Sequence, residues 1–273
     1  MTLVTTWTTL NESDSADLVL CVDFTETGRA EAGFPDLVRN LDYDATFWHV
    51  HPPAVAPGSD VDGADYVRSW IEPIKESGRK VHAVMGYCVG AVYAAELVDL
   101  LAELQGKAPK LIVFDPEPTS LENVYFQFGK VFGILSSILS EEDVAQTRET
   151  MDRLLQVEGI TVEGYAAQLY AAFRDVGHNA FERAGFDVEY SEEMWETLGA
   201  FLSFLTYADH LDPWEGWRSA AAVTSSNPRN GLNRMREAGR DNVVAEELTF
   251  TEGHDVLLTS GDVARAVTKL LER

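Results

Sequence analysis

The sequence is poor in cysteine and in basic residues and has no long apolar segment, and each shortage excludes a class of protein. Two cysteines among 273 residues are too few for a disulfide scaffold and fit a reducing cytoplasm. No apolar stretch approaches the roughly 20 residues that cross a membrane, and residues 1–14 lack the basic and apolar segments of a signal peptide. Acidic residues number 45 against 21 basic ones, and the formal charge of −24 opposes binding to nucleic acid and to anionic membranes. We therefore expect a soluble cytoplasmic protein.

Apolar segments of strand length alternate with segments of helical periodicity. The strand-like segments cover residues 4–10, 17–24, 45–51, 80–85, 110–114, 220–224 and 243–250. Helical periodicity follows several of them, at residues 34–41, 64–77, 89–104 and 262–271. Strands that alternate with helices predict an α/β protein with a mostly parallel sheet and helices on both faces. The length and the hydrophobic fraction of 45% suit one large domain, or a domain with an insertion.

The strand-like segments stop between Pro118 and about Gly216, where the chain becomes helical and rich in aromatic residues. The helical segments there include residues 143–156, 162–175 and 192–207. We predict an α/β core formed by residues 1–118 and 216–273, and a helical lid formed by residues 119–215. The alternative is that this segment is simply a second helical subdomain.

One cysteine lies in a glycine-flanked turn between a predicted strand and a predicted helix, in the pentapeptide Gly86-Tyr87-Cys88-Val89-Gly90. Strand, sharp turn and helix are the context of a nucleophile elbow, with cysteine where most elbows carry serine. Glycines are needed there because the turn is strained and a Cβ atom would crowd the strand against the helix. The N-terminus of the following helix favours a thiolate at Cys88. The alternative is an inert buried thiol, which is how we interpret Cys21.

A thiol nucleophile needs a base, and the base needs an acid that orients it. In a fold with this elbow, the order along the chain is nucleophile, acid and histidine. His254 follows the last strand-like segment and precedes the last helix, so it is the predicted base. Asp115 ends the strand-like segment after Cys88, and the carboxyl ends of parallel strands share one edge, so it is the predicted acid. The fallback candidates for the acid are Glu117, Asp209 and Asp212.

The negative charge that develops on the attacked carbonyl oxygen needs backbone donors. The amide of Val89, directly after the nucleophile, is the first predicted donor of this oxyanion hole. The second is an amide of the turn at residues 25–27, which we assign to Thr25. The alternative for this turn is a plain surface loop.

These residues together resemble a known family. The elbow at Cys88, Asp115 after the next strand, a helical lid and His254 before the last helix look like the α/β-hydrolase thioesterases of nonribosomal peptide and polyketide assembly. The resemblance implies the α/β-hydrolase fold, a Cys-His-Asp site and substrates presented on the phosphopantetheine arm of acyl or peptidyl carrier proteins. It implies no cofactor and no metal bound by the chain itself. Carrier domains are generally acidic, so the charge of −24 opposes their approach.

Cysteine in place of serine is the departure from the usual pattern of that family. With a cysteine at this position, the chain resembles the free-standing aminoacyl transferases, which move an acyl group from one carrier thiol to another. A cysteine exchanges one thioester for another at nearly equal energy, so the acyl group stays activated. The alternatives are a type II thioesterase that hydrolyses acyl carriers, a dienelactone-type hydrolase, and a non-catalytic interaction module. The dienelactone-type hydrolases place acid and histidine closer together than Asp115 and His254 are here.

Overall fold

The computed structural model describes residues 6–25 and 31–273 and shows one seven-stranded sheet. The strand order is β1-β3-β2-β4-β5-β6-β7; β1 runs antiparallel to β3, and every other neighbouring pair is parallel. The strands are β1 (Trp7–Asn11), β2 (Asp17–Val22), β3 (Thr46–Val50), β4 (Lys80–Tyr87), β5 (Lys110–Phe114), β6 (Ala221–Thr224) and β7 (Glu246–Thr249). The predicted mostly parallel sheet is confirmed. The first predicted strand includes residues 4 and 5, which lie outside the described residues.

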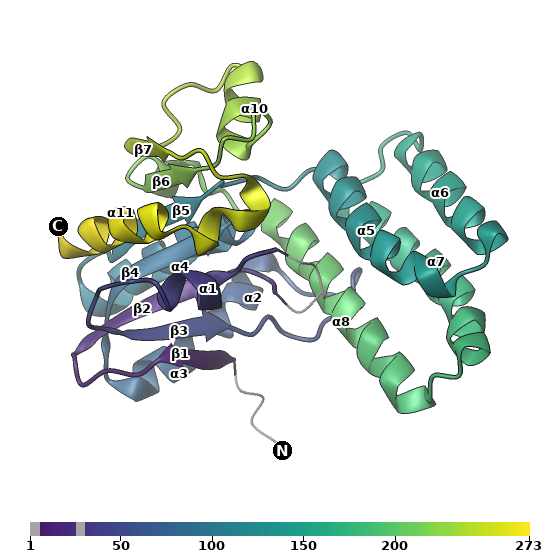
Figure 1. Ribbon diagram of the computed structural model, residues 1–273, viewed down its shortest axis with the longest axis horizontal. Helices are drawn as coiled ribbons and strands as arrows, with labels where there is room; N and C mark the ends of the chain where they lie inside the picture. The colour runs from purple at the N-terminus through teal and green to yellow at the C-terminus, as the bar shows by residue number, and fades with distance from the viewer. Residues whose placement is uncertain (1–5, 26–30) are drawn as a thin grey trace.

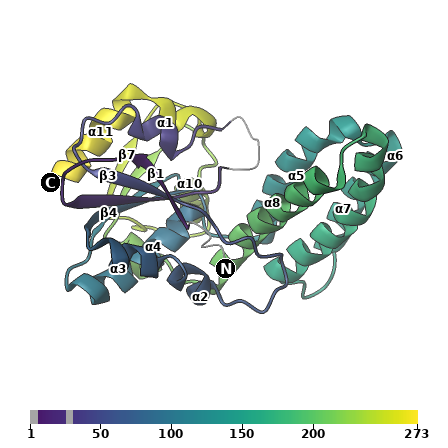
Figure 2. The same ribbon diagram turned by 90° about the horizontal axis from the view of Figure 1, so that it is seen from below.

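Helices cover both faces of the sheet (Figure 2). One face carries α1 (Phe34–Val38) and α11 (Gly261–Glu272), and the other carries α2 (Gly63–Arg68), α3 (Ile71–Ser77) and α4 (Gly90–Gln105). Side chains along a strand alternate between the two faces. Accordingly Leu18 and Leu20 of β2 belong to the hydrophobic core under α2 to α4, whereas Val19 and Cys21 belong to the core under α1 and α11.

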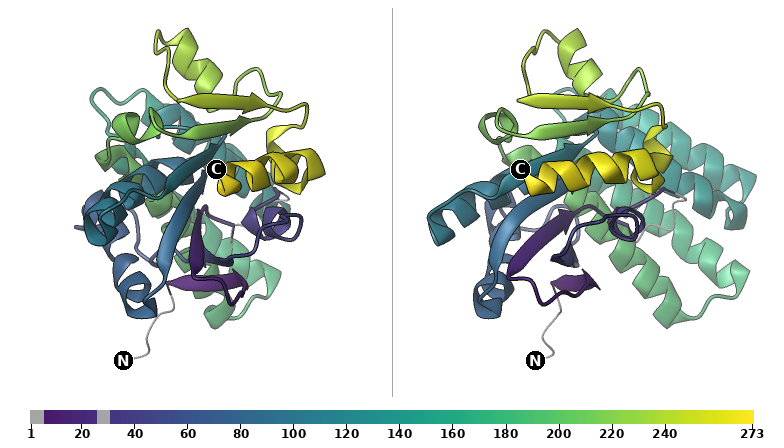
Figure 3. Two further views of the ribbon diagram at one scale, coloured as in Figure 1. Left: turned by 90° about the vertical axis from the view of Figure 1, so that its left-hand side faces the viewer. Right: turned by 60° about the vertical axis from the view of Figure 1, so that its left-hand side comes forward.

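Four long helices lie between β5 and β6 in the sequence and beyond one end of the strands in space (Figures 1 and 3). They are α5 (Leu121–Leu135), α6 (Glu141–Leu155), α7 (Val162–Ala184) and α8 (Val188–Tyr207), and we call them the helical insertion. Aromatic side chains hold them together, since Phe173 and Phe181 both contact the ring of Trp195. Gly177 is required at this contact, because a Cβ atom there would lie 2.3 Å from the Trp195 ring.

The helix predicted at residues 64–77 is divided into α2 and α3, so this prediction was wrong in one detail. Pro73 explains the break, because in a continuous helix its ring would clash with the backbone carbonyl of the residue four positions earlier, which is Ser69. α1 ends at Val38 because Asn40 donates its side-chain amide to the Asp36 carbonyl and competes with helical hydrogen bonding. The short helix α10 (Gly231–Glu237), capped by Asn230, was not predicted.

In the described part of the chain, no helix combines the length and the apolar character that a membrane span requires.

Candidate active site

Cys88 occupies a sharp turn between β4, which ends at Tyr87, and α4, which begins at Gly90. Its φ of 54° lies in the left-handed region, which non-glycine residues adopt only when their surroundings impose it. Two hydrogen bonds do so: the Cys88 amide donates to the Phe114 carbonyl at 2.9 Å, and the Ala91 amide donates to the Cys88 carbonyl at 3.1 Å. The strand, turn and helix that the elbow prediction requires are therefore present.

The two glycines of the elbow leave no room for a side chain. A Cβ atom on Gly86 would lie 2.6 Å from the Ala91 Cα, where β4 and α4 meet. A Cβ atom on Gly90 would lie 2.0 Å from the Val22 carbonyl oxygen, at the end of β2. These contacts bring the start of α4 against the end of β2, so the backbone after β2 lies beside the nucleophile.

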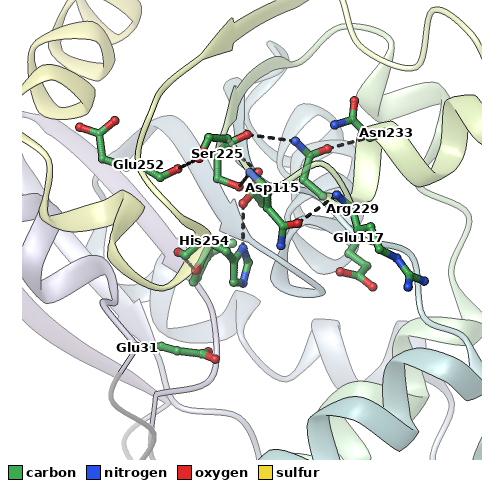
Figure 4. A network of polar contacts seen from close by, with 12 residues as sticks. Glu31, Asp115, Glu117, Ser225, Arg229, Asn233, Glu252 and His254 are labelled. Atoms are coloured by element: carbon green, nitrogen blue, oxygen red, sulfur yellow. Dashed lines mark hydrogen bonds and ion pairs between the residues drawn. The ribbon is translucent and has the colours of Figure 1, made fainter.

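Asp115 follows β5 directly and is 1% exposed. Its Oδ1 accepts a hydrogen bond from the Ser225 amide at 2.8 Å, and its Oδ2 lies 2.7 Å from Nδ1 of His254. Figure 4 shows this chain of contacts from Ser225 through Asp115 to His254. With Nδ1 held by a buried carboxylate, the proton on that nitrogen is fixed and Nε2 is the nitrogen free for proton transfer.

His254 is the first residue of the short 3₁₀ helix His254–Thr259. Tyr87 makes two contacts with it. Tyr87 donates its hydroxyl to the His254 carbonyl at 2.6 Å, and its ring stacks on the imidazole with centroids 4.8 Å apart. Burial lowers the pKa of His254, but hydrogen bonds to Asp115 and Cys88 and their negative charges outweigh it and raise the pKa to about 10. The site therefore stabilises the protonated, imidazolium form of His254.

The structure brings the three predicted residues Cys88, His254 and Asp115 together at one cavity, and it gives two of the three fallback acids other partners. Glu117 forms an ion pair with Arg234 and accepts from Asn123 at 2.9 Å. Asp209 is exposed and Asp212 accepts from the Trp214 amide at 3.2 Å.

Cys21, interpreted above as a core residue, is fully buried, and burial and the nearby Asp23 charge raise the pKa of its thiol.

A cavity that is partly open to solvent lies over Cys88. The sheet side contributes Cys88, Val89 and His254, and the helical insertion contributes Gln127 of α5 and three apolar residues of α8. Those three are Phe201, Phe204 and Leu205. The helical insertion thus forms part of the wall around the thiol.

The two predicted oxyanion donors lie at the same cavity. Val89 is the N-cap residue of α4, and Thr25 lies in the segment that follows β2. Residues 26–30, which include the remainder of the turn considered for the second donor, lie outside the described residues. Which amide of this turn faces the substrate stays a prediction.

Sequence reasoning missed three residues of the site. Ser225 fixes Asp115 through its amide, Tyr87 fixes His254, and Asp23 lines the cavity. Ser225 and Asp23 each lie just past the end of a strand that neighbours a predicted site strand, and that position is the signal that could have found them. Within residues 6–25 and 31–273, no group of three or more His, Cys, Asp or Glu side chains could hold a metal ion.

No protein-family model and no curated protein matches the chain. In fold it is similar to the four-domain nonribosomal peptide synthetase holo-AB3403, bound to AMP and glycine, with a TM-score of 0.61 at 12% identity; the match covers 98% of this chain and 20% of the synthetase. It is also similar to the NocB thioesterase domain of the nocardicin cluster, in covalent complex with a nocardicin G analogue, with a TM-score of 0.54 at 13% identity over 98% of this chain and 100% of the domain.

A third similar structure is YbtT, a type II thioesterase from the yersiniabactin biosynthetic pathway. The TM-score is 0.52 at 13% identity, and the match covers 98% of this chain and 97% of YbtT. Identities this low establish the fold. Together with the parallel sheet and the elbow, they confirm the prediction that the chain has the α/β-hydrolase fold.

Proposed function

We propose that the protein is an acyl or aminoacyl transferase that moves a thioester-bound group between phosphopantetheinyl carrier proteins through a thioester on Cys88. One observation carries the proposal: the elbow holds a cysteine, and this thiol lines the same cavity as His254, which Asp115 holds in turn. The thioesterase domains and the type II thioesterase of similar fold support carrier-bound thioesters as the substrate class.

The proposed reaction uses the three side chains in two symmetrical steps. The Cys88 sulfur attacks the carbonyl carbon of the donor thioester, and His254 protonates the departing carrier thiol. An acceptor carrier thiol then gives its proton to His254 and attacks the Cys88 thioester, which releases Cys88. Asp115 orients His254 and stabilises its protonated form, and the amides of Val89 and Thr25 donate to the oxyanion in both steps.

Cysteine favours transfer over hydrolysis for a chemical reason. A serine would convert the thioester into an ester of lower energy, which an acceptor thiol cannot readily reverse. A Cys88 thioester is nearly equal in energy to the carrier thioesters on either side of it. Thiolates attack thioesters faster than water does at neutral pH, so the acyl group can wait on Cys88 for its acceptor.

In this proposal residues 119–215 act as a lid. Gln127, Phe201 and Phe204 of the helical insertion line the cavity over Cys88, so a substrate arm must pass beside them to reach the thiol. Such a cover limits the access of water and thereby lengthens the life of the thioester.

The second candidate function is a type II thioesterase that releases acyl groups to water. The similarity in fold to YbtT favours it, and the same three side chains would serve it. A dienelactone-type hydrolase is less well supported, since the whole helical insertion separates Asp115 from His254 in the chain. A non-catalytic module would leave the thiol apart from the histidine, whereas Cys88 and His254 line the same cavity.

Intact-protein mass spectrometry after incubation with an acyl-loaded carrier tests the covalent step. The wild type and the control variant Cys21→Ala should both gain the mass of the acyl group, and Cys88→Ala should gain none. Failure of the wild type to form an adduct, or an adduct that persists in Cys88→Ala, would contradict the proposal.

A further inference from the structure

An apolar wall forms part of the cavity over Cys88, and the proposed mechanism gives it no role. Its four residues are Phe24, which lies just after β2, and Phe201, Phe204 and Leu205 of α8. The three residues of α8 are three or four positions apart, so one face of the helix presents them all to the cavity. Each of the four is at most 7% exposed. The wall is therefore packed from behind and offers only a small surface to a substrate.

Contacts between aromatic rings hold this wall in place. The ring of Phe24 packs on those of Phe201 and Phe204, with centroids 5.3 and 5.7 Å away. The ring of Phe204 also lies 4.8 Å from that of Tyr93 on α4, and Tyr93 donates its hydroxyl to the Phe204 carbonyl at 2.7 Å. Tyr93 is itself fully buried. Because a packed interior resists the insertion of even one more methylene group, the wall cannot move back to admit a longer substrate.

The space in front of the wall is small. The cavity leaves about 40 Å³ for the centres of water molecules, which is room for about three of them. A methylene group is similar in size to a water molecule, so an acyl chain of about three or four carbons fills this space. In a bound thioester the pantetheine side extends from the carbonyl toward the carrier in solvent. The acyl side therefore takes the space between Cys88 and the apolar wall.

We propose that the wall of Phe24, Phe201, Phe204 and Leu205 limits the length of the acyl group that Cys88 accepts, so that chains of up to about four carbons react and longer chains are excluded. This inference rests on the proposed covalent chemistry of Cys88 and specifies the size of its substrates. The four side chains have no group that forms a hydrogen bond, so the wall selects by size. Each methylene group beyond the limit must displace a packed ring, and one methylene group in an apolar pocket changes a rate by about 10- to 200-fold.

Acyl-pantetheines with unbranched chains from acetyl to octanoyl test this limit, with the rate of adduct formation on Cys88 measured by intact-protein mass spectrometry. We expect the wild type to react at least about tenfold more slowly with the hexanoyl than with the butyryl thioester. Phe204→Leu should raise the ratio of the hexanoyl to the acetyl rate by about tenfold, and Leu205→Phe should lower the ratio of the butyryl to the acetyl rate by a similar factor. The control is Phe132→Leu, since Phe132 is buried against Phe173 in the helical insertion and is not part of the cavity lining. It should keep the wild-type ratios.

Alkylation of Cys88 by iodoacetamide, which carries no acyl chain, shows whether the site is intact in each variant. Opposite shifts in Phe204→Leu and Leu205→Phe support the inference, because a general loss of structure cannot produce both, and Leu205→Phe alone decides the matter where Phe204→Leu fails to fold. A wild type that reacts equally fast with the acetyl and octanoyl thioesters would overturn the inference and leave the proposed function standing. Wild-type ratios in both wall variants, or the same shift in Phe132→Leu, would also overturn it. Absence of an adduct from every thioester of the series would overturn the proposed function as well.

Discussion

The two cysteines differ in their exposure to solvent, so their reactivity should differ. Cys88 is partly exposed at a cavity that His254 also lines, whereas Cys21 is fully buried and burial raises the pKa of its thiol. Because thiolates react and thiols do not, iodoacetamide should label Cys88 in the native protein at least about a hundredfold faster than Cys21. Peptide mapping after timed labelling measures both rates. Comparable labelling of the two cysteines would show that Cys88 is not activated.

His254 should make stability depend on pH with a definite sign. Its pKa is about 10 in the folded protein and about 6.5 in an unfolded chain, so folding favours the protonated form. The stabilisation is complete below about pH 6.5 and is lost as the pH rises toward 10. Urea unfolding measures this at pH 6 and at pH 9.5. Between these two values the free energy of unfolding of the wild type should fall by on the order of 2 kcal/mol more than that of His254→Gln, which has no titrating ring. An equal loss in the two proteins would contradict the raised pKa.

At the scale of single residues, the sequence was sufficient to predict those site residues whose order along the chain is set by the fold. Cys88, Asp115 and His254 follow strand ends in the order that the elbow fold requires, so pattern alone was enough to place them. Ser225 and Tyr87 could not be assigned their contacts, because those contacts depend on how neighbouring strands and the last loop meet in space. The pairing of Asp23 with His49 likewise depends on β2 and β3 being neighbours in the sheet.

At the scale of elements, the elbow depends on glycine in a way that a matched pair of substitutions can test. Gly90→Ala would place a Cβ atom 2.0 Å from the Val22 carbonyl oxygen, where backbone meets backbone. We expect a loss of several kcal/mol of stability, or failure to fold. Gly133→Ala is the control, since α5 has open space at that position; it should stabilise the protein by up to about 1 kcal/mol. Thermal unfolding of both variants measures this, and a small effect of Gly90→Ala would contradict the packing at the elbow.

The sequence pattern predicted the long helices and missed the short or divided ones. Long periodic segments such as α4 and α8 were predicted because an apolar face repeats along each of them. The division between α2 and α3 was missed although Pro73 marks it, because apolar periodicity continues across the break. The helix α10 was missed because seven residues carry too little periodicity to detect, and its Asn230 cap is also a common turn residue.

At the scale of the whole molecule, the charge of −24 should govern the encounter with an acidic carrier. Repulsion between like charges is screened as the Debye length falls from about 30 Å at 0.01 M salt to about 10 Å at 0.1 M. The rate constant for acylation of Cys88 by an acyl-loaded carrier should therefore rise over this range. Acyl-pantetheine, which lacks the charge of the carrier, is the control and should react at a nearly constant rate. A carrier reaction that slows with salt would instead indicate attraction by a local basic surface.

The fate of the acyl group on Cys88 tests the central claim most directly. The wild-type adduct, made with a labelled acyl group and freed of its donor, is mixed with a second carrier that bears a free phosphopantetheine thiol, or with buffer alone. We expect the label to reach the second carrier at least about tenfold faster than it reaches water. The same measurement on Cys88→Ser should show release to water only, because an acceptor thiol does not readily reverse an ester. Release of the wild-type label to water at the same rate with and without the second carrier would contradict transfer and establish hydrolysis.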